Sequence, residues 1–145
     1  MISKKCKYAI KAVLYIARKS EENRPPFAAE IAENEHIPLK FLETILRELK
    51  NNRILLSKRG KMGGYVLLKK PEEIKLMEII RIMDGPIALS PCVSLNYYSP
   101  CDDCNEATCM IKKVFEQVRD VTLEVLGGSN IKMMVDKEKE LRQAK

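Results

Sequence analysis

The chain has 145 residues, of which 46% are hydrophobic and 32% are charged, a composition typical of a folded domain and not of a disordered chain. Its net charge of +6 and pI near 9.1 favour a polyanionic partner, because lysine and arginine displace the counterions around a phosphate backbone. No run approaches the roughly 18 apolar residues that span a membrane, so we expect a cytoplasmic protein with no membrane partner.

The first predicted helix covers residues 3–19. Its apolar residues recur at helical spacing and include Cys6, which this pattern assigns to the core and not to chemistry. Its first half is crowded with lysines at positions that oppose the helix dipole: Lys4, Lys5, Lys7 and Lys11. A negatively charged group near the start of this helix would explain the lysines. The alternative is that they form a solvated basic face.

Two short helices follow, at residues 28–34 and from Pro38 onward, with a turn at His36 and Ile37. The apolar side of the second helix is formed by Leu39, Leu42, Leu46 and Leu49. Its opposite side carries polar residues that can reach base edges or phosphates: Lys40, Glu43, Thr44, Arg47 and Asn51. This pattern indicates a helix-turn-helix, although many helical hairpins share it.

Residues 54–56 and 65–68 predict two strands joined by a glycine-containing loop. A hairpin directly after a recognition-type helix is the wing of a winged helix. Its tip carries Lys58, Arg59 and Lys61, and an arginine there suits a narrow minor groove. A further helix is expected to begin at Pro71 and to end at Asp84-Gly85-Pro86, with Ile74, Met77, Ile80 and Met83 facing inward.

The last predicted helix, at residues 110–128, has the alternating spacing of a heptad seam. We expect the seam to pair with the same helix of a second copy, and packing on its own domain is the alternative. The seam consists of Ile111, Val114, Val118, Val121 and Val125. The charged residues 129–145 are expected to fray.

Four motifs resemble, in order, the IscR, NsrR and CymR group of bacterial winged-helix regulators: SKKCKYAIKAVLYIA, IPLKFLETILRELKNN, SKRGKMGGY and a cysteine-bearing stretch before the last helix. The resemblance covers residues 2–128. It implies a homodimeric transcription factor, often a repressor, whose last helices cross at the dimer axis. It also implies contacts with double-stranded DNA from Pro38, Lys40, Phe41, Glu43, Thr44 and the wing Arg59.

Four of the five cysteines lie in one stretch with the spacing C-x8-C-x2-C-x4-C: Cys92, Cys101, Cys104 and Cys109. Four thiolates suit an iron-sulfur cluster or, as the alternative, a tetrahedral zinc site. Two further interpretations stay open: redox-active thiols without a metal, and a loop that is ordered by disulfides. Many members of the group hold a cluster with three evenly spaced cysteines, so Cys101 and Cys104 compete for the middle position or act together. Lys112 stands where one subgroup has a ligating histidine.

The sequence thus predicts a mainly α fold with a small β-hairpin wing. We expect a winged helix-turn-helix DNA-binding domain at residues 1–85, a cysteine-rich sensor loop at 86–109, a dimerisation helix at 110–128 and a charged tail at 129–145. The predicted function is a homodimeric regulator switched by the cysteine loop. A zinc-stapled or metal-free regulator, or a protein-interaction module, is the alternative. An enzyme is disfavoured, because His36 is the single histidine and no nucleophile and base pair is evident.

Overall fold

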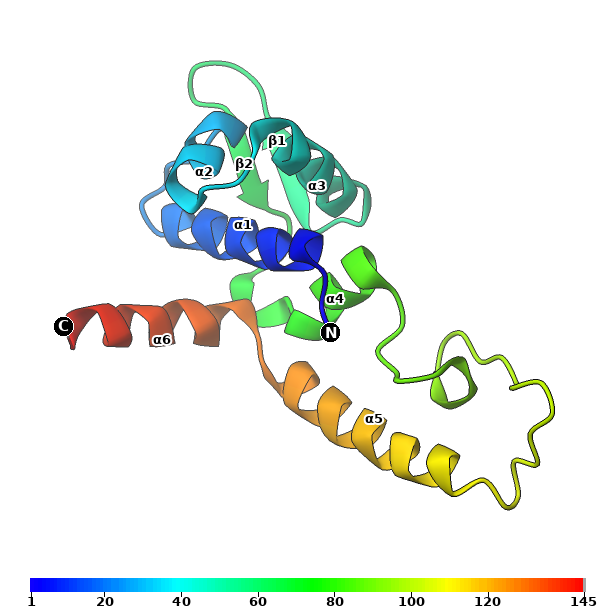
Figure 1. Cartoon of the computed structure of the whole chain (residues 1–145). Helices are drawn as coiled ribbons and strands as arrows, with labels where there is room; N and C mark the ends of the chain where they lie inside the picture. Colours follow the sequence, from blue (N-terminus) through cyan, green and yellow to red (C-terminus); the bar gives the residue numbers. More distant parts are fainter. Residues whose placement is uncertain (145) are drawn as a thin grey trace.

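The computed structural model of the chain describes residues 1–144, and within them it has a mainly α fold with one antiparallel hairpin. Figure 1 shows α1, α2, α3 and the hairpin gathered in one body, from which α5 runs away. The elements in chain order are α1 (Lys4–Ser20), α2 (Ala28–Glu35), α3 (Leu39–Asn51), β1 (Leu55–Lys58), β2 (Gly64–Leu67), the 3₁₀ helix η1 (Pro71–Glu73), α4 (Leu76–Asp84), the 3₁₀ helix η2 (Pro91–Val93), α5 (Met110–Gly128) and α6 (Ile131–Gln143).

α1 is the central helix of the N-terminal body and packs against α2, α3, α4, α6 and β2. The Ser3 hydroxyl caps it by accepting a hydrogen bond from the Cys6 N–H at 3.0 Å. Cys6 is fully buried, which confirms its predicted place in the core. Burial, followed by the charge of Asp84, raises the pKa of Cys6 to about 11, so this thiol stays protonated and unreactive.

The apolar side of α3 packs on α1 through Leu42, Ile45, Leu46 and Leu49, all fully buried. Burial of each such side chain contributes about 1.5–3 kcal/mol. Leu39 was predicted to face the core, but it is exposed at the first position of α3, and Ile45 is buried on the inner face instead.

α2, a tight turn and α3 form the predicted helix-turn-helix. His36 ends α2 in the left-handed region, with a φ of 55°, which few residues other than glycine adopt. The Ile37 N–H donates to the Ala32 carbonyl at 3.0 Å and closes the turn. Pro38 is the N-cap of α3, so the helix begins at Leu39, one position later than the sequence predicts.

β1 and β2 form the predicted hairpin, with Leu55 opposite Leu67 and Lys58 opposite Gly64. Gly64 has a φ of +132° and passes so close to the α1–α2 connection that a Cβ would lie 2.6 Å from the Pro26 carbonyl oxygen. The Tyr65 N–H donates to that oxygen at 2.8 Å. The base of the wing is thereby fixed to the body.

The helix predicted from Pro71 to Asp84 is wrong in its first half. Residues 71–73 form η1, Ile74 and Lys75 are extended, and α4 begins at Leu76. The extended pair is held by the connection from α5 to α6 and by the first residue of α6. The Leu76 N–H donates to the Ser129 carbonyl at 2.9 Å, and the Ile131 N–H donates to the Ile74 carbonyl at 3.0 Å. Long-range pairing thus overrides the local helix signal of Pro71.

The expectation that residues 129–145 fray is also wrong for the described part. Residues 131–143 form α6, whose Ile131 and Val135 are buried against α1. Arg18 of α1 donates to Glu138 at 2.6 Å and to Glu35 at 2.7 Å. The charged residues of α6 therefore surround a short apolar stripe that belongs to the N-terminal body.

α5 extends from the body, and its main contacts are with α4 and η2. None of its residues is buried. Among the helices within residues 1–144, none is both long and apolar enough to cross a membrane.

Candidate nucleic-acid interface and cysteine loop

The side of α3 opposite its buried Leu42, Ile45 and Leu49 is polar and exposed. Lys40, Glu43, Thr44 and Arg47 recur every three or four residues on it, and Pro38 is exposed at its start. A guanidinium can pair with guanine and a carboxylate can accept from cytosine, so the face offers both kinds of base-edge contact. Lys40 and Arg47 form no ion pair within residues 1–144, which leaves their charges available to a partner.

Phe41 differs from these neighbours, because it is half-buried between α1 and α3. Its ring meets the Tyr8 ring edge to face, with centroids 5.7 Å apart and an interplanar angle of 75°. Such a contact is favourable beyond simple burial. Phe41 therefore orients α3 on α1, in addition to any contact that its exposed edge makes with a partner.

The tip of the wing is tight and basic. Lys58, Arg59 and Lys61 are exposed there, and the Gly63 N–H donates to the Gly60 carbonyl at 2.9 Å to close the turn. Gly60 adopts a φ of +93°, which side chains disfavour. Figure 1 shows the wing loop and α3 on the side of the body away from α5 and α6. The two predicted DNA-contacting regions therefore lie at one end of the molecule.

The cysteine stretch begins at Cys92 in η2 and ends at Cys109, the N-cap residue of α5. Cys92 is buried, Cys104 and Cys109 are half-buried, and Cys101 is exposed. The four side chains lie near enough to influence one another's pKa values, with Cys92 the largest influence on Cys101 and Cys109 the largest on Cys104. As they stand, however, no three cysteine, histidine or acidic side chains within residues 1–144 surround a point that suits a metal ion.

The four thiols are not equivalent as nucleophiles or ligands. The Lys112 N–H donates to the Cys109 Sγ at 3.4 Å at the start of α5, and this bond lowers the pKa of Cys109. Interaction with Cys92 raises the pKa of Cys101, and interaction with Cys109 raises the pKa of Cys104. Among Cys101, Cys104 and Cys109, Cys109 is therefore the one most readily present as thiolate, the form that binds metals and attacks disulfides.

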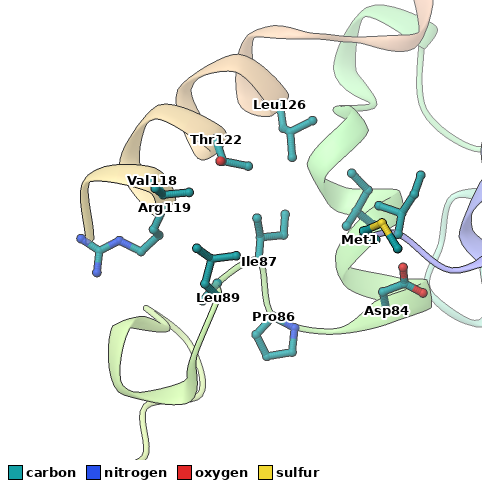
Figure 2. A pocket seen from close by; sticks show the side chains of 12 residues that line it. Met1, Asp84, Pro86, Ile87, Leu89, Val118, Arg119, Thr122 and Leu126 are labelled. Carbon is teal, nitrogen blue, oxygen red and sulfur yellow. The ribbon is translucent and has the colours of Figure 1, made fainter. Parts of the chain in front are cut away.

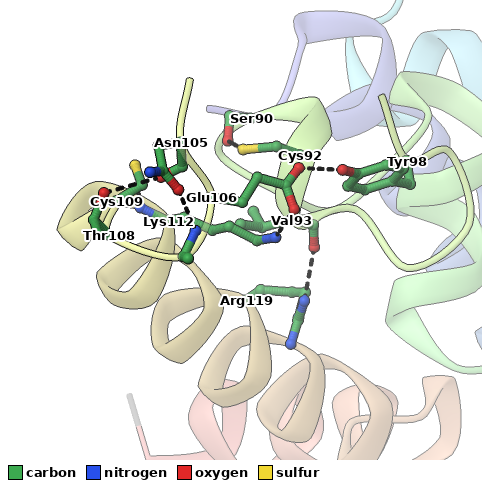
Figure 3. A network of polar contacts seen from close by, with 11 residues as sticks. Ser90, Cys92, Val93, Tyr98, Asn105, Glu106, Thr108, Cys109, Lys112 and Arg119 are labelled. Carbon is green, nitrogen blue, oxygen red and sulfur yellow. Dashed lines mark hydrogen bonds and ion pairs between the residues drawn. The ribbon is translucent and has the colours of Figure 1, made fainter. Parts of the chain in front are cut away.

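A polar network that sequence patterns did not reveal closes the loop onto α5 (Figure 3). Glu106 accepts hydrogen bonds from the Tyr98 hydroxyl and from the Lys112 Nζ, the latter at 2.7 Å. These bonds, with that of Lys112 the larger influence, lower the pKa of Glu106. Lys112 also lies 5.9 Å from the centroid of the Tyr98 ring. Because the three residues come from irregular chain and a helix, no periodicity relates them.

Arg119 makes a second connection between the loop and α5. Its Nη1 donates to the Val93 carbonyl at 2.9 Å, next to Cys92 (Figure 3). The Arg119 side chain is only 14% exposed and also pairs with Asp120. Both ends of the cysteine stretch are therefore fixed to one helix, at Cys109 through the helix start and at Val93 through Arg119.

A cavity of about 300 Å³ separates α5 from the N-terminal body (Figure 2). It is lined by apolar groups of α4, α5 and the connection between them, among them Ile80, Ile87, Val118 and Leu126, with Asp84 and Arg119 at its sides. Val118 also belongs to the predicted seam. The five seam residues Ile111, Val114, Val118, Val121 and Val125 are between 41% and 65% exposed, so the chain itself leaves this apolar stripe uncovered.

The helix-turn-helix, its basic wing and the exposed polar face of α3 define a winged-helix protein of the DNA-binding class. Residues 2–137 match the family described as "Rrf2: Iron-dependent Transcriptional regulator". The chain belongs to the Rrf2 family of transcriptional regulators, which are not enzymes.

Individual relatives support this assignment. An rrf2-like HTH-type regulator of Rhodobacter capsulatus is 46% identical over 121 residues, which is 81% of each chain. The regulator CymR of Bacillus subtilis is 28% identical, covering 90% of this chain and 86% of that protein. The solved structure of B. subtilis CymR superimposes with a TM-score of 0.78 at 27% identity, covering 94% of this chain and 97% of that one. The structure of T. potens IscR gives a TM-score of 0.77 at 27% identity, covering 97% and 90%.

Proposed function

We propose that the protein is a homodimeric transcriptional repressor whose affinity for DNA is set by the state of its cysteine loop. The observation that carries this proposal is the double attachment of the loop to α5, through Cys109 at the helix start and through the bond from Arg119 to the Val93 carbonyl. Metal binding or oxidation at the thiols would act on these two attachments, since Cys109 is one of them and Cys92 is next to the other. The seam of α5 would pass that movement to the second copy.

The proposed DNA contacts divide by chemistry. Lys40, Glu43, Thr44 and Arg47 on α3 are assigned to the major groove, where base edges can be read directly. Lys58, Arg59 and Lys61 on the wing are assigned to the minor groove and its phosphates. Pro38 and Phe41, at the start of α3, are assigned to contacts with the DNA backbone. The two DNA-binding domains of one dimer would contact half-sites separated by one turn of the double helix.

The proposed dimer is supported by the uncovered seam and by the cavity beside it. The two adjoin along α5, because Val118 belongs to both. Apolar side chains of a second α5 placed on the seam would cover the stripe and reach the mouth of the cavity. Isologous contacts of this kind, with the same residues on both sides, are the usual basis of a dimer.

An iron-sulfur cluster is the proposed occupant of the cysteine loop, with the alternative of zinc. The donor chemistry fits either group, since both prefer thiolate sulfur. Cys92, Cys101, Cys104 and Cys109 would hold it, after the exposed part of the loop draws the thiols round one centre. When bound, a cluster would make the loop responsive to iron supply and to oxidants. Lys112 pairs with Glu106 here and takes no part as a ligand.

Anaerobic purification followed by absorption spectroscopy and metal analysis tests the occupant. We expect a visible chromophore with bound iron, lost when Cys92 or Cys109 is changed to Ser. Cys6→Ala is the matched control, because Cys6 lies in the core far from the loop in sequence and should leave the chromophore intact. A colourless protein with stoichiometric zinc would overturn the cluster and leave the DNA-binding proposal standing.

Arg59→Ala tests the wing. We expect weaker binding to duplex DNA and a relaxed preference for A/T-rich flanks, because the arginine that enters the narrow groove is removed. Competition between duplexes that differ only in their flanks measures both effects. Lys69→Ala serves as the control, because it removes one exposed cation that is not at the wing tip. Unchanged affinity and unchanged flank preference for Arg59→Ala would contradict the wing assignment.

A further inference from the structure

The start of α1 carries more positive charge than the end of a helix normally tolerates. Four lysines lie within its first eight residues, and the free backbone N–H groups of its first turn already create a positive potential. Lys5 pairs with Glu48 of α3 at 2.7 Å. The other three, Lys4, Lys7 and Lys11, form no ion pair within residues 1–144. Asp84 accepts a hydrogen bond from the Ser3 N–H at 2.7 Å. Its negative charge therefore offsets positive charge at the first residues of α1 but not along the rest of the helix.

These three lysines share one face of the helix. Their spacing of three and four residues places them along a single stripe, and all three are exposed. We call Lys4, Lys7 and Lys11 the lysine stripe. Nothing in the core requires lysine at these positions, so their charge is not explained by the fold.

The lysine stripe lies beside the recognition helix. Lys4 Nζ is 5.7 Å from the centroid of the Tyr8 ring, and that ring contacts Phe41 of α3. Lys5, on the flank of the stripe, holds Glu48 through both carboxylate oxygens, at 2.7 and 2.8 Å. These two contacts join the first half of α1 to the start of α3, at Phe41, and to the end of α3, at Glu48. Through Tyr8 and Phe41, Lys4 of the stripe is connected to the first turn of α3, where Lys40 is exposed.

We propose that the lysine stripe is a second phosphate-binding element, which contacts the DNA backbone at the edge of the major groove that α3 enters. This inference rests on the proposed function. The major groove is about 12 Å wide, so a helix inside it has phosphates at its flanks. A helix packed alongside, as α1 is, presents its lysines to those phosphates. The contacts fix orientation and carry no sequence preference, since every phosphate is alike.

The test uses the full-length chain with Lys4, Lys7 and Lys11 all changed to Gln. A control triple variant, Lys113→Gln, Lys137→Gln and Lys139→Gln, changes the net charge equally at exposed lysines of α5 and α6. The probe is the pool of duplexes, about 40 base pairs long, that the wild type enriches from a random library. Circular dichroism checks that both variants are folded, and anisotropy across a range of salt gives affinity.

We expect the stripe variant to bind about tenfold or more weakly near physiological salt, with a salt slope shallower by about 0.9 for each lost lysine–phosphate contact. Its ranking of different duplexes should match the wild type, and the control should match it in all respects. An unchanged slope in the folded stripe variant, or an equal loss in the control, would overturn the inference while leaving the proposed function intact. Failure of the wild type to enrich any duplex would overturn both.

Discussion

The Val118→Glu/Val121→Glu variant is expected to be a monomer and to bind the enriched duplexes at least about 100-fold more weakly than the wild type. Both valines are exposed in the single chain but would lie between two copies of α5. A dimer of the variant would have to bury four carboxylates without partners, at several kcal/mol each. A monomer has one DNA-binding domain and makes about half of the phosphate contacts, each of which contributes to affinity.

Light scattering coupled to gel filtration measures the mass, and anisotropy measures the affinity. Lys113→Glu is the matched control, since it makes the same change in net charge on an exposed position of α5 outside the seam. We expect it to remain dimeric and to bind DNA with little loss. A dimeric Val118→Glu/Val121→Glu variant with wild-type affinity would show that the seam is not the interface.

The Arg119→Met variant is expected to bind DNA with nearly the same affinity whether its cysteine loop is loaded or stripped. Methionine keeps the apolar stem in the cavity wall but cannot donate to the Val93 carbonyl, which Arg119 reaches at 2.9 Å. Coupling between two sites of a regulator typically corresponds to about a 5- to 150-fold difference in affinity. We expect such a difference in the wild type and a ratio near one in the variant.

The control for this variant is Arg119→Lys, which keeps the charge and a donor to the Val93 carbonyl and should keep part of the response. Each protein is measured loaded and after chelator treatment, with the mass of the dimer checked in both states. The coupling role of Arg119 is contradicted if Arg119→Met responds to loading as strongly as the wild type. A monomeric Arg119→Met protein would instead assign Arg119 to the dimer interface.

The helix-turn-helix and the wing were predictable because their signals are local. The periodic leucines of α3 and the glycines at the wing tip each report a backbone geometry within a few residues. The same reasoning failed at Pro71, where pairing with residues 129–131 holds Ile74 extended. That pairing joins segments more than fifty residues apart, and no local pattern reports it.

α6 was missed for a different reason, because its signal was present but weak. Asn130 caps the helix by accepting from the Met133 N–H at 2.9 Å, and Ile131 and Val135 follow at helical spacing. Two buried residues among many charged ones resemble a solvated tail. Their partner is α1, whose own sequence does not indicate that a further helix covers it.

In the candidate site, sequence identified the ligand-type cysteines but not the residues that connect them to the rest of the fold. Arg119 lies between seam positions and looks like an ordinary surface charge, and Tyr98 lies in irregular chain. Their roles depend on how the loop folds back on α5, which hydrogen bonds to Val93 and Glu106 determine. Such contacts follow from the three-dimensional path of the chain alone.

The most direct test of the central claim is one anisotropy titration of the anaerobically purified wild type against the enriched duplexes, before and after removal of the loop's metal by a chelator. We predict dimeric protein in both states and affinities that differ by about fivefold or more, in the range of allosteric coupling. The Cys92→Ser variant should give one curve under both treatments. Identical curves for the wild type, with its metal demonstrably removed, would contradict the claim that the cysteine loop controls DNA binding.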